Sequence, residues 1–331
     1  LEETPEQFVE SLVNVFREIK RVLKDDGTLW LNLGDSYSSG GRTTTTNQSV
    51  RGDKDYGVTR PPPVEGIKPK DLFGIPWRVA FALQADGWYL RQDIIWNKPN
   101  PMPESVQDRC TKAHEYIFLL SKSPHYYFDN VAIKEETTTF DNSNRDRDTT
   151  KLNNTPGRTK MAGLKTNQYE TRNKRSVWTV NTKPYKEAHF AVFPTDLIEP
   201  CVLAGSSAKI CSGCGKSYRR EMVTTDVPDR IVRDHMVGVI PKRDKPSRMN
   251  SKDMLSLTKE DNGFVKQCEC DTDHTEQDRI IDPFGGSGTT ALVADRHNRD
   301  ATVIELNEEY IEIAKNRLEG DAPLFAKVEV S

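Results

Sequence analysis

Residues 281–290 read IDPFGGSGTT and contain a glycine-rich turn. A short apolar run ends at Asp282 just before the glycines, and a helical pattern begins at about Ser287. The next apolar run, residues 301–305, ends in Glu305. Strand, glycine turn, helix and strand in this order form a βαβ unit, whose ligands bind at the carboxyl edge of the sheet. The sequence therefore predicts an α/β fold with a Rossmann-like site.

The chemistry of the turn narrows the class of ligand. Gly285, Gly286 and Gly288 permit a tight turn, and the following helix offers unpaired N–H groups. No lysine follows Gly288, and the residues after it do not complete G-x-G-x-x-G, so neither the P-loop nor the dinucleotide pattern fits. Asp282 suits a cationic or amine-bearing ligand better than a pyrophosphate, and Glu305 can accept hydrogen bonds from both hydroxyls of a ribose. A purely structural strand–turn–helix is the alternative.

Composition limits the classes of protein that the chain can belong to. A length of 331 residues allows about two domains, or one domain with a large insertion. The net charge of −3 means that a nucleic-acid partner would have to meet a local basic patch. No run approaches the roughly 18 apolar residues of a membrane span, and there is no signal-peptide pattern, so we expect no membrane partner.

Further helices and strands are predicted ahead of the turn. Thr4 and Gln7 form a capping box at the start of an amphipathic helix, which Asp26-Gly27 ends. Apolar runs predict strands over 28–34, 88–98 and 114–123, and helical patterns cover 71–85 and 192–206.

The stretch DPFGGSGTT (282–290), followed by VIELNEEYIEIAKNRL (303–318), resembles the S-adenosylmethionine site of DNA amino-methyltransferases. These enzymes methylate the exocyclic N4 of cytosine or N6 of adenine. HFAVFPTDLIEPCVLAG (189–205) resembles the segment just upstream in that family. The resemblance implies a Rossmann-like, S-adenosylmethionine-dependent methyltransferase sheet. In the family, the target amine attacks the sulfonium methyl directly.

The resemblance also implies roles for individual residues. Asp282 and the turn from Phe284 to Thr290 would hold the methionine part of the cofactor, and Glu305 would hold the ribose. Residues of the upstream segment would line the same pocket. The implied cofactor-binding set is Asp282, Phe284, Gly286, Gly288, Thr289, Thr290, Glu305, Phe193, Pro194 and Thr195.

The late position of the turn indicates the permuted order of the family, with the catalytic half first and the cofactor half last. LWLNLGDSY (29–37) and DIIWNKPNPMPE (93–104) resemble that catalytic half. The methyltransferase domain is therefore expected to comprise residues 1–206 and 276–331.

The family's catalytic tetrapeptide, (D/N/S)-P-P-(Y/F/W), does not occur in the chain: RPPPVEG (60–66) has no aromatic residue after its prolines. In the family its polar side chain and a backbone carbonyl accept hydrogens from the target amine, and its ring stacks on the flipped base. In permuted members it precedes the helix that begins here at Thr4. We therefore expect the chain to be an N-terminally truncated fragment, whose catalytic residues are unknown. The fragment would also lack the strand that lies beside the cofactor strand in the family. It is therefore expected to bind the cofactor weakly and to show no turnover.

Three short segments allow both a functional and a structural interpretation. GDSY (34–37) is either a catalytic turn or a polar turn at a strand end. Lys98, in a proline-rich loop, either contacts a DNA phosphate or belongs to an ordinary stiff turn. Tyr126, Tyr127 and Phe128 either stack on a base or pack in the core.

Four of the six cysteines form two close pairs, Cys211 with Cys214 and Cys268 with Cys270. Without a secretory signal, close pairs favour a metal over disulfides. Four thiolates are the ligand set of a closed structural zinc site, with His274 as a possible substitute ligand. Two unrelated reduced pairs are the alternative.

Residues 207–275 are therefore expected to form a Cys-rich, zinc-binding insertion, whose residues between the pairs form a finger. The finger is either a DNA contact or a structural clip. The segment 141–176 holds nine Lys or Arg against four Asp or Glu. We expect it to be flexible and to contact the DNA backbone, with a solvated linker as the alternative.

The sequence therefore predicts a site-specific DNA methyltransferase acting on cytosine N4 or adenine N6. Its expected partners are double-stranded DNA and a restriction endonuclease of the same system. Its expected location is the cytoplasm of a bacterium or archaeon, with a phage gene as another source. The alternatives are an RNA or protein methyltransferase and an inactive DNA-binding protein with a methyltransferase fold.

Overall fold

The structure, a computed structural model, describes residues 2, 4–38, 66–136, 171–183, 192–226, 257–322 and 327–330. The basic segment 141–176 lies outside these ranges except for residues 171–176, and so does the centre of the predicted finger. Within these ranges, no helix combines the length and the apolar character that a bilayer span requires.

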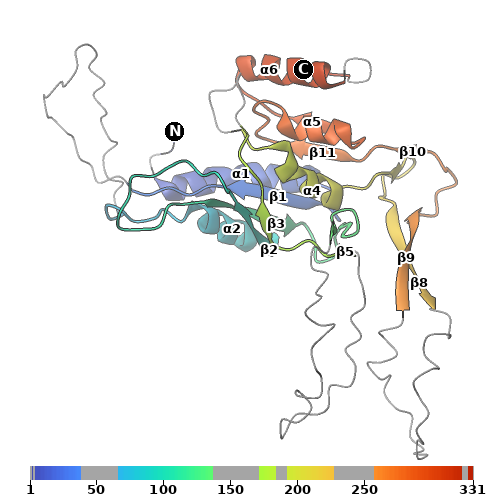
Figure 1. Cartoon of the computed structure of the whole chain (residues 1–331). Helices are drawn as coiled ribbons and strands as arrows, with labels where there is room; N and C mark the ends of the chain where they lie inside the picture. Colours follow the sequence, from blue (N-terminus) through green and yellow to red (C-terminus); the bar gives the residue numbers. More distant parts are fainter. Residues whose placement is uncertain are drawn as a thin grey trace, which may run out of the picture.

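A four-stranded sheet, in the order β1-β3-β2-β6, forms the centre of the first half of the chain (Figure 1). Its strands are β1 (Thr28–Leu33), β2 (Tyr89–Asn97), β3 (His114–Ser121) and β6 (Val177–Thr179). β3 runs antiparallel to β1 and β2, whereas β6 is parallel to β2. The three predicted strands are confirmed, with ends that shift by two residues at most. The short strand β6 was not predicted.

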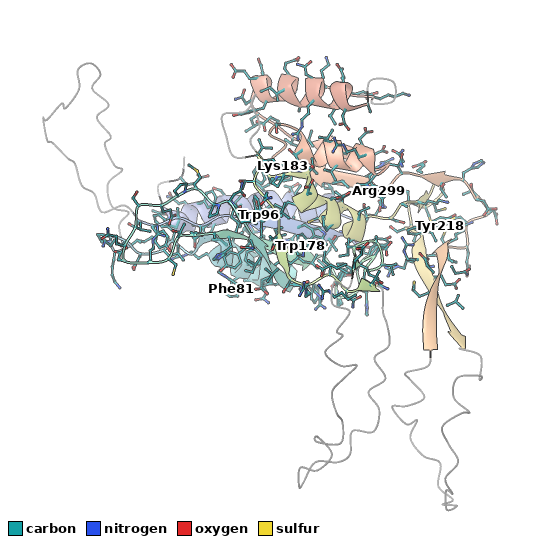
Figure 2. All side chains as sticks on the ribbon, in the orientation of Figure 1. Phe81, Trp96, Trp178, Lys183, Tyr218 and Arg299 are labelled. Carbon is teal, nitrogen blue, oxygen red and sulfur yellow. The ribbon has the colours of Figure 1, made fainter. Side chains whose placement is uncertain are left out.

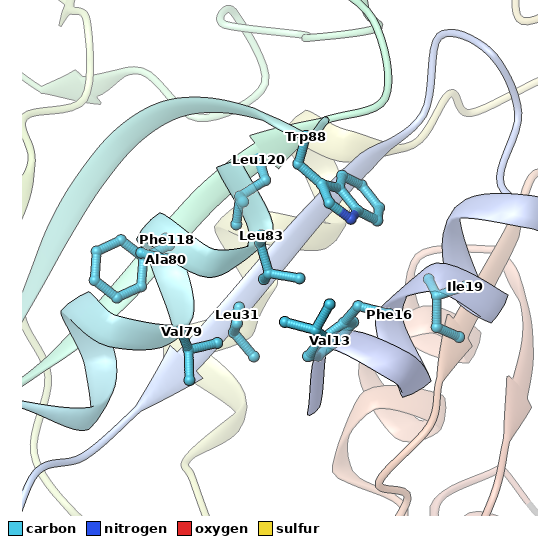
Figure 3. Packing of buried hydrophobic residues seen from close by; sticks show 10 residues of the cluster. All are labelled: Val13, Phe16, Ile19, Leu31, Val79, Ala80, Leu83, Trp88, Phe118 and Leu120. Atoms are coloured by element: carbon cyan, nitrogen blue, oxygen red, sulfur yellow. The ribbon is translucent and has the colours of Figure 1, made fainter. Parts of the chain in front are cut away.

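Helices α1 (Pro5–Val22) and α2 (Ile75–Ala85) cover one face of this sheet. The predicted capping box is present, since the Thr4 side chain accepts from the Gln7 N–H and the Gln7 side chain accepts from the Thr4 N–H. Helix α2 begins four residues later than predicted, because Gly74, which precedes it, has a left-handed backbone with a φ of 71°. Figure 3 shows the core between these layers, formed by Val13, Phe16, Ile19, Leu31, Val79, Ala80, Leu83, Trp88, Phe118 and Leu120.

Helix α4 (Thr195–Gly205) covers the opposite face. Its Leu197 and Cys201 pack against Trp96 of β2 and Trp178 of β6, both labelled in Figure 2. The helix ends close to β1, because a Cβ on Gly205 would lie only 2.7 Å from Nε1 of Trp30. The helix predicted over 192–206 is thus confirmed in a shorter form.

The predicted βαβ unit is confirmed as β11 (Arg279–Asp282), α5 (Thr289–Arg296), β12 (Asp300–Val303) and α6 (Glu308–Asp321). β11 and β12 pair in parallel as a separate two-stranded sheet. Among the described strands, β11 pairs only with β12. Helix α5 packs on α4, and α6 lies on the far side of α5 (Figure 1).

β11 runs antiparallel to α1. Asp278, just before the strand, pairs with Lys24 beyond the end of the helix, whereas Phe284, just after the strand, contacts Phe16 at 6.3 Å between ring centroids. β1 also returns along α1 after the turn at Gly27. The carboxyl ends of β1 and β11 therefore lie at one edge of the molecule, where ligands of α/β proteins bind.

The cysteine-bearing insertion contains two strand pairs. The short strands β7 (Ile210–Cys211) and β10 (Thr275–Glu276) pair antiparallel. The longer strands β8 (Arg219–Asp226) and β9 (Leu257–Val265) form an antiparallel ribbon that projects from the body (Figure 1). A further short pair joins β4 (Glu135–Glu136), which precedes the basic segment, to β5 (Thr171–Arg172), which lies near the end of that segment.

Candidate cofactor site and cysteine cluster

The glycine turn is held tightly against the elements around it. Gly286 and Gly288 have φ values of 49° and 72°, which side chains rarely adopt. A Cβ on Gly288 would also lie 2.8 Å from the Cβ of Ala314 on α6. The Gly285 N–H donates to the carbonyl of Ile304 at 2.8 Å, which fixes the turn to the chain after β12. The backbone conformation and the close packing of this turn therefore both require glycine.

Asp282 organises the turn through both carboxylate oxygens. Oδ1 accepts from the N–H of Phe284 at 2.9 Å, and Oδ2 accepts from the hydroxyl of Thr290 at 2.5 Å. The carboxylate thus connects the end of β11 to the first turn of α5. The helix begins at Thr289, two residues later than predicted, because Gly288 is left-handed.

Glu305 lies opposite Asp282 and binds the same turn. Oε2 accepts from the N–H of Gly286 at 2.7 Å, and Oε1 accepts from the N–H groups of Leu306 and Asn307 at 2.9 Å each. A carboxylate offers about four lone-pair positions, so these three bonds leave acceptor capacity for a further donor. β12 ends at Val303, so Glu305 stands two residues beyond the strand rather than at its tip.

Exposed apolar side chains occur in the glycine turn and on either side of Glu305 in the chain. Leu306, next to Glu305 in the chain, is 96% exposed, and Phe284 and Ile304 are 53% and 47% exposed. Phe284 belongs to the predicted cofactor-binding set, whereas Leu306 and Ile304 do not. One apolar residue on each side of Glu305 is the sequence signal that could have identified them.

Thr289 points toward α6 rather than away from the protein. It is 3% exposed, and its hydroxyl accepts from Arg317 at 2.8 Å. Arg317 also donates to the carbonyl and the hydroxyl of Ser287, at 3.2 Å each. Arg317, which the sequence analysis did not select, therefore ties the turn to α6.

Phe193, Pro194 and Thr195 lie at the start of α4. Phe193 is partly buried and packs with the second core cluster, beside Trp96 and Trp178. The Thr195 hydroxyl donates to its neighbour Asp196 at 3.1 Å. In the part of the chain that the structure describes, the hydrogen bonds of these three residues do not reach the glycine turn.

Asp35 of the GDSY segment caps α2. Its carboxylate accepts from the N–H groups of Gly74 and Ile75, at 3.1 and 3.2 Å, and from that of Ser36 at 3.0 Å. These contacts satisfy amides that the helix leaves unpaired. The structural interpretation of GDSY therefore accounts for Asp35.

Lys98 is also engaged within the protein. Its ammonium pairs with the Glu115 carboxylate and lies 4.2 Å from the ring centroid of Trp96. The side chain is 19% exposed. The structural interpretation of this loop therefore fits better than a free phosphate contact.

The aromatic residues after β3 are part of the packed structure. Phe128 stacks on Trp30 with ring centroids 6.2 Å apart, and Tyr126 accepts a hydrogen bond from Arg91 at 3.2 Å. Tyr127 is buried, and burial raises the pKa of its phenol to about 12. Packing in the core therefore accounts for Tyr127, whereas Tyr126 is partly buried and Phe128 is 37% exposed.

The structure brings the four predicted cysteines together. The Sγ atoms of Cys211, Cys214, Cys268 and Cys270 all lie within 4.8 Å of one another. A tight turn forms the first pair, since the Gly215 N–H donates to the Cys211 carbonyl at 2.7 Å and Gly215 has a φ of 70°.

The elements around the cluster hold both pairs in place. The backbone carbonyl of His274, rather than its ring, contacts the first pair, accepting from the Ser212 N–H at 3.1 Å. The Lys266 ammonium donates to the carbonyls of Cys270 and Thr272, at 2.5 and 2.7 Å. The cluster therefore consists of four thiols with a fixed backbone around them.

The pKa values of Cys211 and Cys270 differ strongly, although both thiols belong to the same cluster. Hydrogen bonds from the backbone N–H groups of Cys214 and Gly213 lower the pKa of Cys211 to about 7. Contacts with the thiols of Cys214 and Cys268 raise the pKa of Cys270 to about 12. One thiolate therefore forms readily, whereas a full set of four requires a cation among them.

Known proteins match nearly the whole length of the chain. The model of the N6/N4 DNA methylase family matches residues 1–209 and 254–316. The Type II methyltransferase M.Cfr9I of Citrobacter freundii is 39% identical over 321 residues, which are 97% of this chain and 74% of the relative. M.SmaI of Serratia marcescens is 39% identical over 320 residues, 96% of this chain and 76% of the relative.

A solved structure agrees on the fold. The cytosine-N4-specific PvuII DNA methyltransferase aligns with a TM-score of 0.50 and 14% sequence identity, covering 99% of this chain and 73% of that one. This likeness confirms the α/β methyltransferase fold. Together with the match over most of the sequence, it shows that the chain belongs to the N6/N4 DNA methylase family.

Proposed function

We propose that this Type II DNA methyltransferase transfers a methyl group from S-adenosylmethionine to cytosine N4 or adenine N6 within a specific double-stranded DNA sequence. The observation that carries this proposal is that the carboxylates of Asp282 and Glu305 both bind the same glycine turn, at the carboxyl end of β11. The protein would serve a restriction-modification system, with a restriction endonuclease as its functional partner.

The residues of the turn fit the cofactor group by group. The sulfonium and amino groups are cationic, and the carboxylate of Asp282 gives this side of the turn a negative charge. The remaining acceptor capacity of Glu305 suits the ribose hydroxyls. The exposed side chains of Phe284 and Leu306 offer an apolar surface to the adenine.

The start of α5 suits the methionine carboxylate. Gly288 precedes the helix, and no side-chain cap covers its first amides in the described structure. Unpaired N–H groups and the positive end of the helix dipole stabilise an anion there. The carboxylate of the bound methionine is therefore expected at the first turn of α5.

The chemistry needs no covalent intermediate on the protein. When bound, the cofactor supplies an electrophilic methyl group on a positively charged sulfur. The nitrogen of the target amine forms the new bond to carbon as the sulfur–carbon bond breaks, and the amine loses one proton. Burial raises the pKa of Cys201, which makes that thiol a poor nucleophile.

We further propose that the four-cysteine cluster holds a structural zinc ion. Tetrahedral zinc with bonds of about 2.3 Å places thiolates roughly 3.8 Å apart, which the grouping of all four Sγ atoms within 4.8 Å accommodates. The low pKa of Cys211 and the backbone held by Lys266 favour such a site.

Contact with the DNA backbone is proposed for the basic segment 141–176. Of its described residues, Arg172 and Arg175 both pair with Glu135, at 3.2 and 3.4 Å. These two arginines are therefore less available to phosphates than an unpaired arginine would be. The proposed phosphate contacts rest on the other basic residues of the segment.

The product identifies the reaction. The complete gene is expressed in a host that lacks amino-methylated bases, and its DNA is digested to nucleosides for mass spectrometry. We expect N4-methylcytosine or N6-methyladenine, and much less of it with Asp282→Asn. Methylation at carbon 5 of cytosine, or no methylated base in the DNA, would contradict the proposal.

A further inference from the structure

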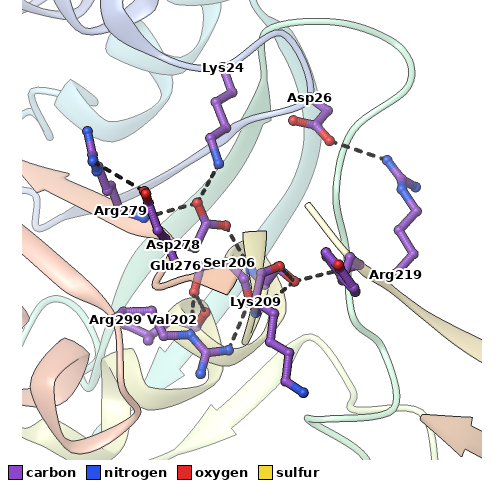
Figure 4. A network of polar contacts seen from close by, with 12 residues as sticks. Lys24, Asp26, Val202, Ser206, Lys209, Arg219, Glu276, Asp278, Arg279 and Arg299 are labelled. Carbon is purple, nitrogen blue, oxygen red and sulfur yellow. Dashed lines mark hydrogen bonds and ion pairs between the residues drawn. The ribbon is translucent and has the colours of Figure 1, made fainter. Parts of the chain in front are cut away.

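Asp278 lies at the junction between the cysteine-bearing insertion and the cofactor strand. It follows β10 by two residues and directly precedes β11. Its side chain is 8% exposed, and its carboxylate accepts from Lys24 Nζ at 2.6 Å, from the Ser207 N–H at 2.9 Å and from the Arg279 N–H at 3.0 Å (Figure 4). A buried carboxylate requires such partners, so these contacts hold the side chain in one position.

The donors come from different parts of the chain. Lys24 follows α1 in the catalytic half, Ser207 precedes β7 at the entry to the insertion, and Arg279 begins β11. The backbone carbonyl of Asp278 also accepts from the N–H of Asp300, the first residue of β12, at 2.9 Å. One residue therefore connects the catalytic half, the insertion and both strands of the cofactor unit.

A second set of contacts fixes the entry to the insertion. Arg299, which lies before β12, donates to the hydroxyl and the carbonyl of Ser206 at 3.1 Å each. The Ser207 hydroxyl contacts the carbonyls of Lys209 and Tyr218 at 2.8 Å each. The chain that enters β7 and the chain that leaves β10 therefore meet at Asp278.

The cysteine cluster lies directly beyond this junction. Cys211 is the last residue of β7 and pairs with Thr275 of β10. A metal that joined the two cysteine pairs would hold β7 and β10 together, and with them Ser207 and Asp278. From Asp278 the strand β11 continues for four residues to Asp282 in the cofactor site.

We propose that Asp278 is a positioning residue that transmits the metal state of the cysteine cluster to the cofactor site. The inference rests on the proposed function. With the metal in place, the junction fixes β11 against α1, so that Asp282 and Glu305 face the ligand in the binding geometry. Without the metal, the pairing of β7 with β10 weakens, β11 loses this anchor, and cofactor affinity falls. Linkage requires that the cofactor tighten metal binding by the same factor.

Titration calorimetry tests the coupling. The dissociation constant for S-adenosylmethionine is measured with zinc-loaded and chelator-stripped protein. Removal of zinc is expected to weaken wild-type binding about tenfold, within the usual range of coupling between sites. In Asp278→Asn this ratio should fall to about two or less, and in Lys24→Met, the milder variant, to an intermediate value.

A matched control breaks a different contact of the insertion. Arg220 on β8 donates to both carboxylate oxygens of Asp129, at 3.1 and 3.0 Å, and this contact does not include any hydrogen-bond partner of the Asp278 carboxylate. Arg220→Met should therefore keep the wild-type ratio. A wild-type ratio near one, or an unchanged ratio in both Asp278→Asn and Lys24→Met, would overturn the inference.

Hydrogen exchange separates this inference from the proposed function. The backbone N–H groups of β11 and β12, which pair with each other, should lose protection on zinc removal in the wild type and change little in Asp278→Asn. If the protein bound no S-adenosylmethionine, the proposed function would fail, and the exchange data would still decide the coupling. Equal protection of these wild-type amides with and without zinc would overturn it.

Discussion

Replacing Gly288 with alanine should damage the cofactor turn through two separate effects. The residue has a φ of 72°, and a left-handed backbone costs a residue with a Cβ about 1–2 kcal/mol. The new methyl group would also lie 2.8 Å from the Cβ of Ala314 on α6, and overpacking of this kind costs about 1–3 kcal/mol. The expected loss in the free energy of unfolding is therefore about 2–5 kcal/mol.

Two matched variants separate the effects. Gly286 also has a positive φ, 49°, but a Cβ there would meet nothing closer than 4.0 Å. Gly286→Ala should therefore cost only the backbone share, about 1–2 kcal/mol. Ala314→Gly removes the atom that Gly288→Ala would strike, at about 1 kcal/mol for glycine within a helix.

Urea unfolding of the four proteins and of the double variant Gly288→Ala/Ala314→Gly measures these terms. The double variant should be more stable than the sum of the two single effects predicts, by the steric share of about 1–3 kcal/mol. Strict additivity, or equal losses for Gly288→Ala and Gly286→Ala, would show that α6 does not pack on the turn as described.

Three further predictions concern other parts of the chain. Asp35→Ala should lower the free energy of unfolding by about 1–2 kcal/mol, because the first amides of α2 lose their acceptor, and urea unfolding against Asp35→Asn measures this. The pKa of Tyr127 is raised from 10.0 to about 12 in the folded protein, so its contribution to stability is fully present below pH 10.0 and is lost as the pH rises toward 12. The free energy of unfolding, measured between pH 8 and 11, should therefore fall less steeply with pH in Tyr127→Phe than in the wild type. Cys270→Ser should lower the zinc content from about one ion per chain, measured by mass spectrometry after dialysis, whereas Cys110→Ser, outside the cluster, should not.

Elements with local signals were predictable from the sequence. The Thr4 and Gln7 capping box placed the start of α1 correctly, and the short apolar run that ends at Asp282 identified β11. The start of α5 was predicted two residues early because the pattern does not reveal the left-handed backbone of Gly288. β6 was missed because a strand of three residues beside a long polar segment has no periodicity to detect.

Contacts between distant segments were harder to predict. Close spacing identified each cysteine pair, and the structure brought both pairs together through β7 and β10. Arg317 reaches Ser287 only because α6 packs on the turn, which the sequence does not reveal. Lys98 looked available for a phosphate, and its pairing with Glu115 depends on the register of β2 against β3.

The central claim, that Glu305 holds the ribose of S-adenosylmethionine beside the glycine turn, can be tested directly by calorimetry. The cofactor and its analogue without the two ribose hydroxyls are titrated into wild-type protein and into Glu305→Gln. We expect Glu305→Gln to weaken cofactor binding about tenfold or more, because a hydrogen bond to a charged group is lost, and barely to change binding of the analogue. An equal loss for both ligands, or none for the cofactor, would contradict it.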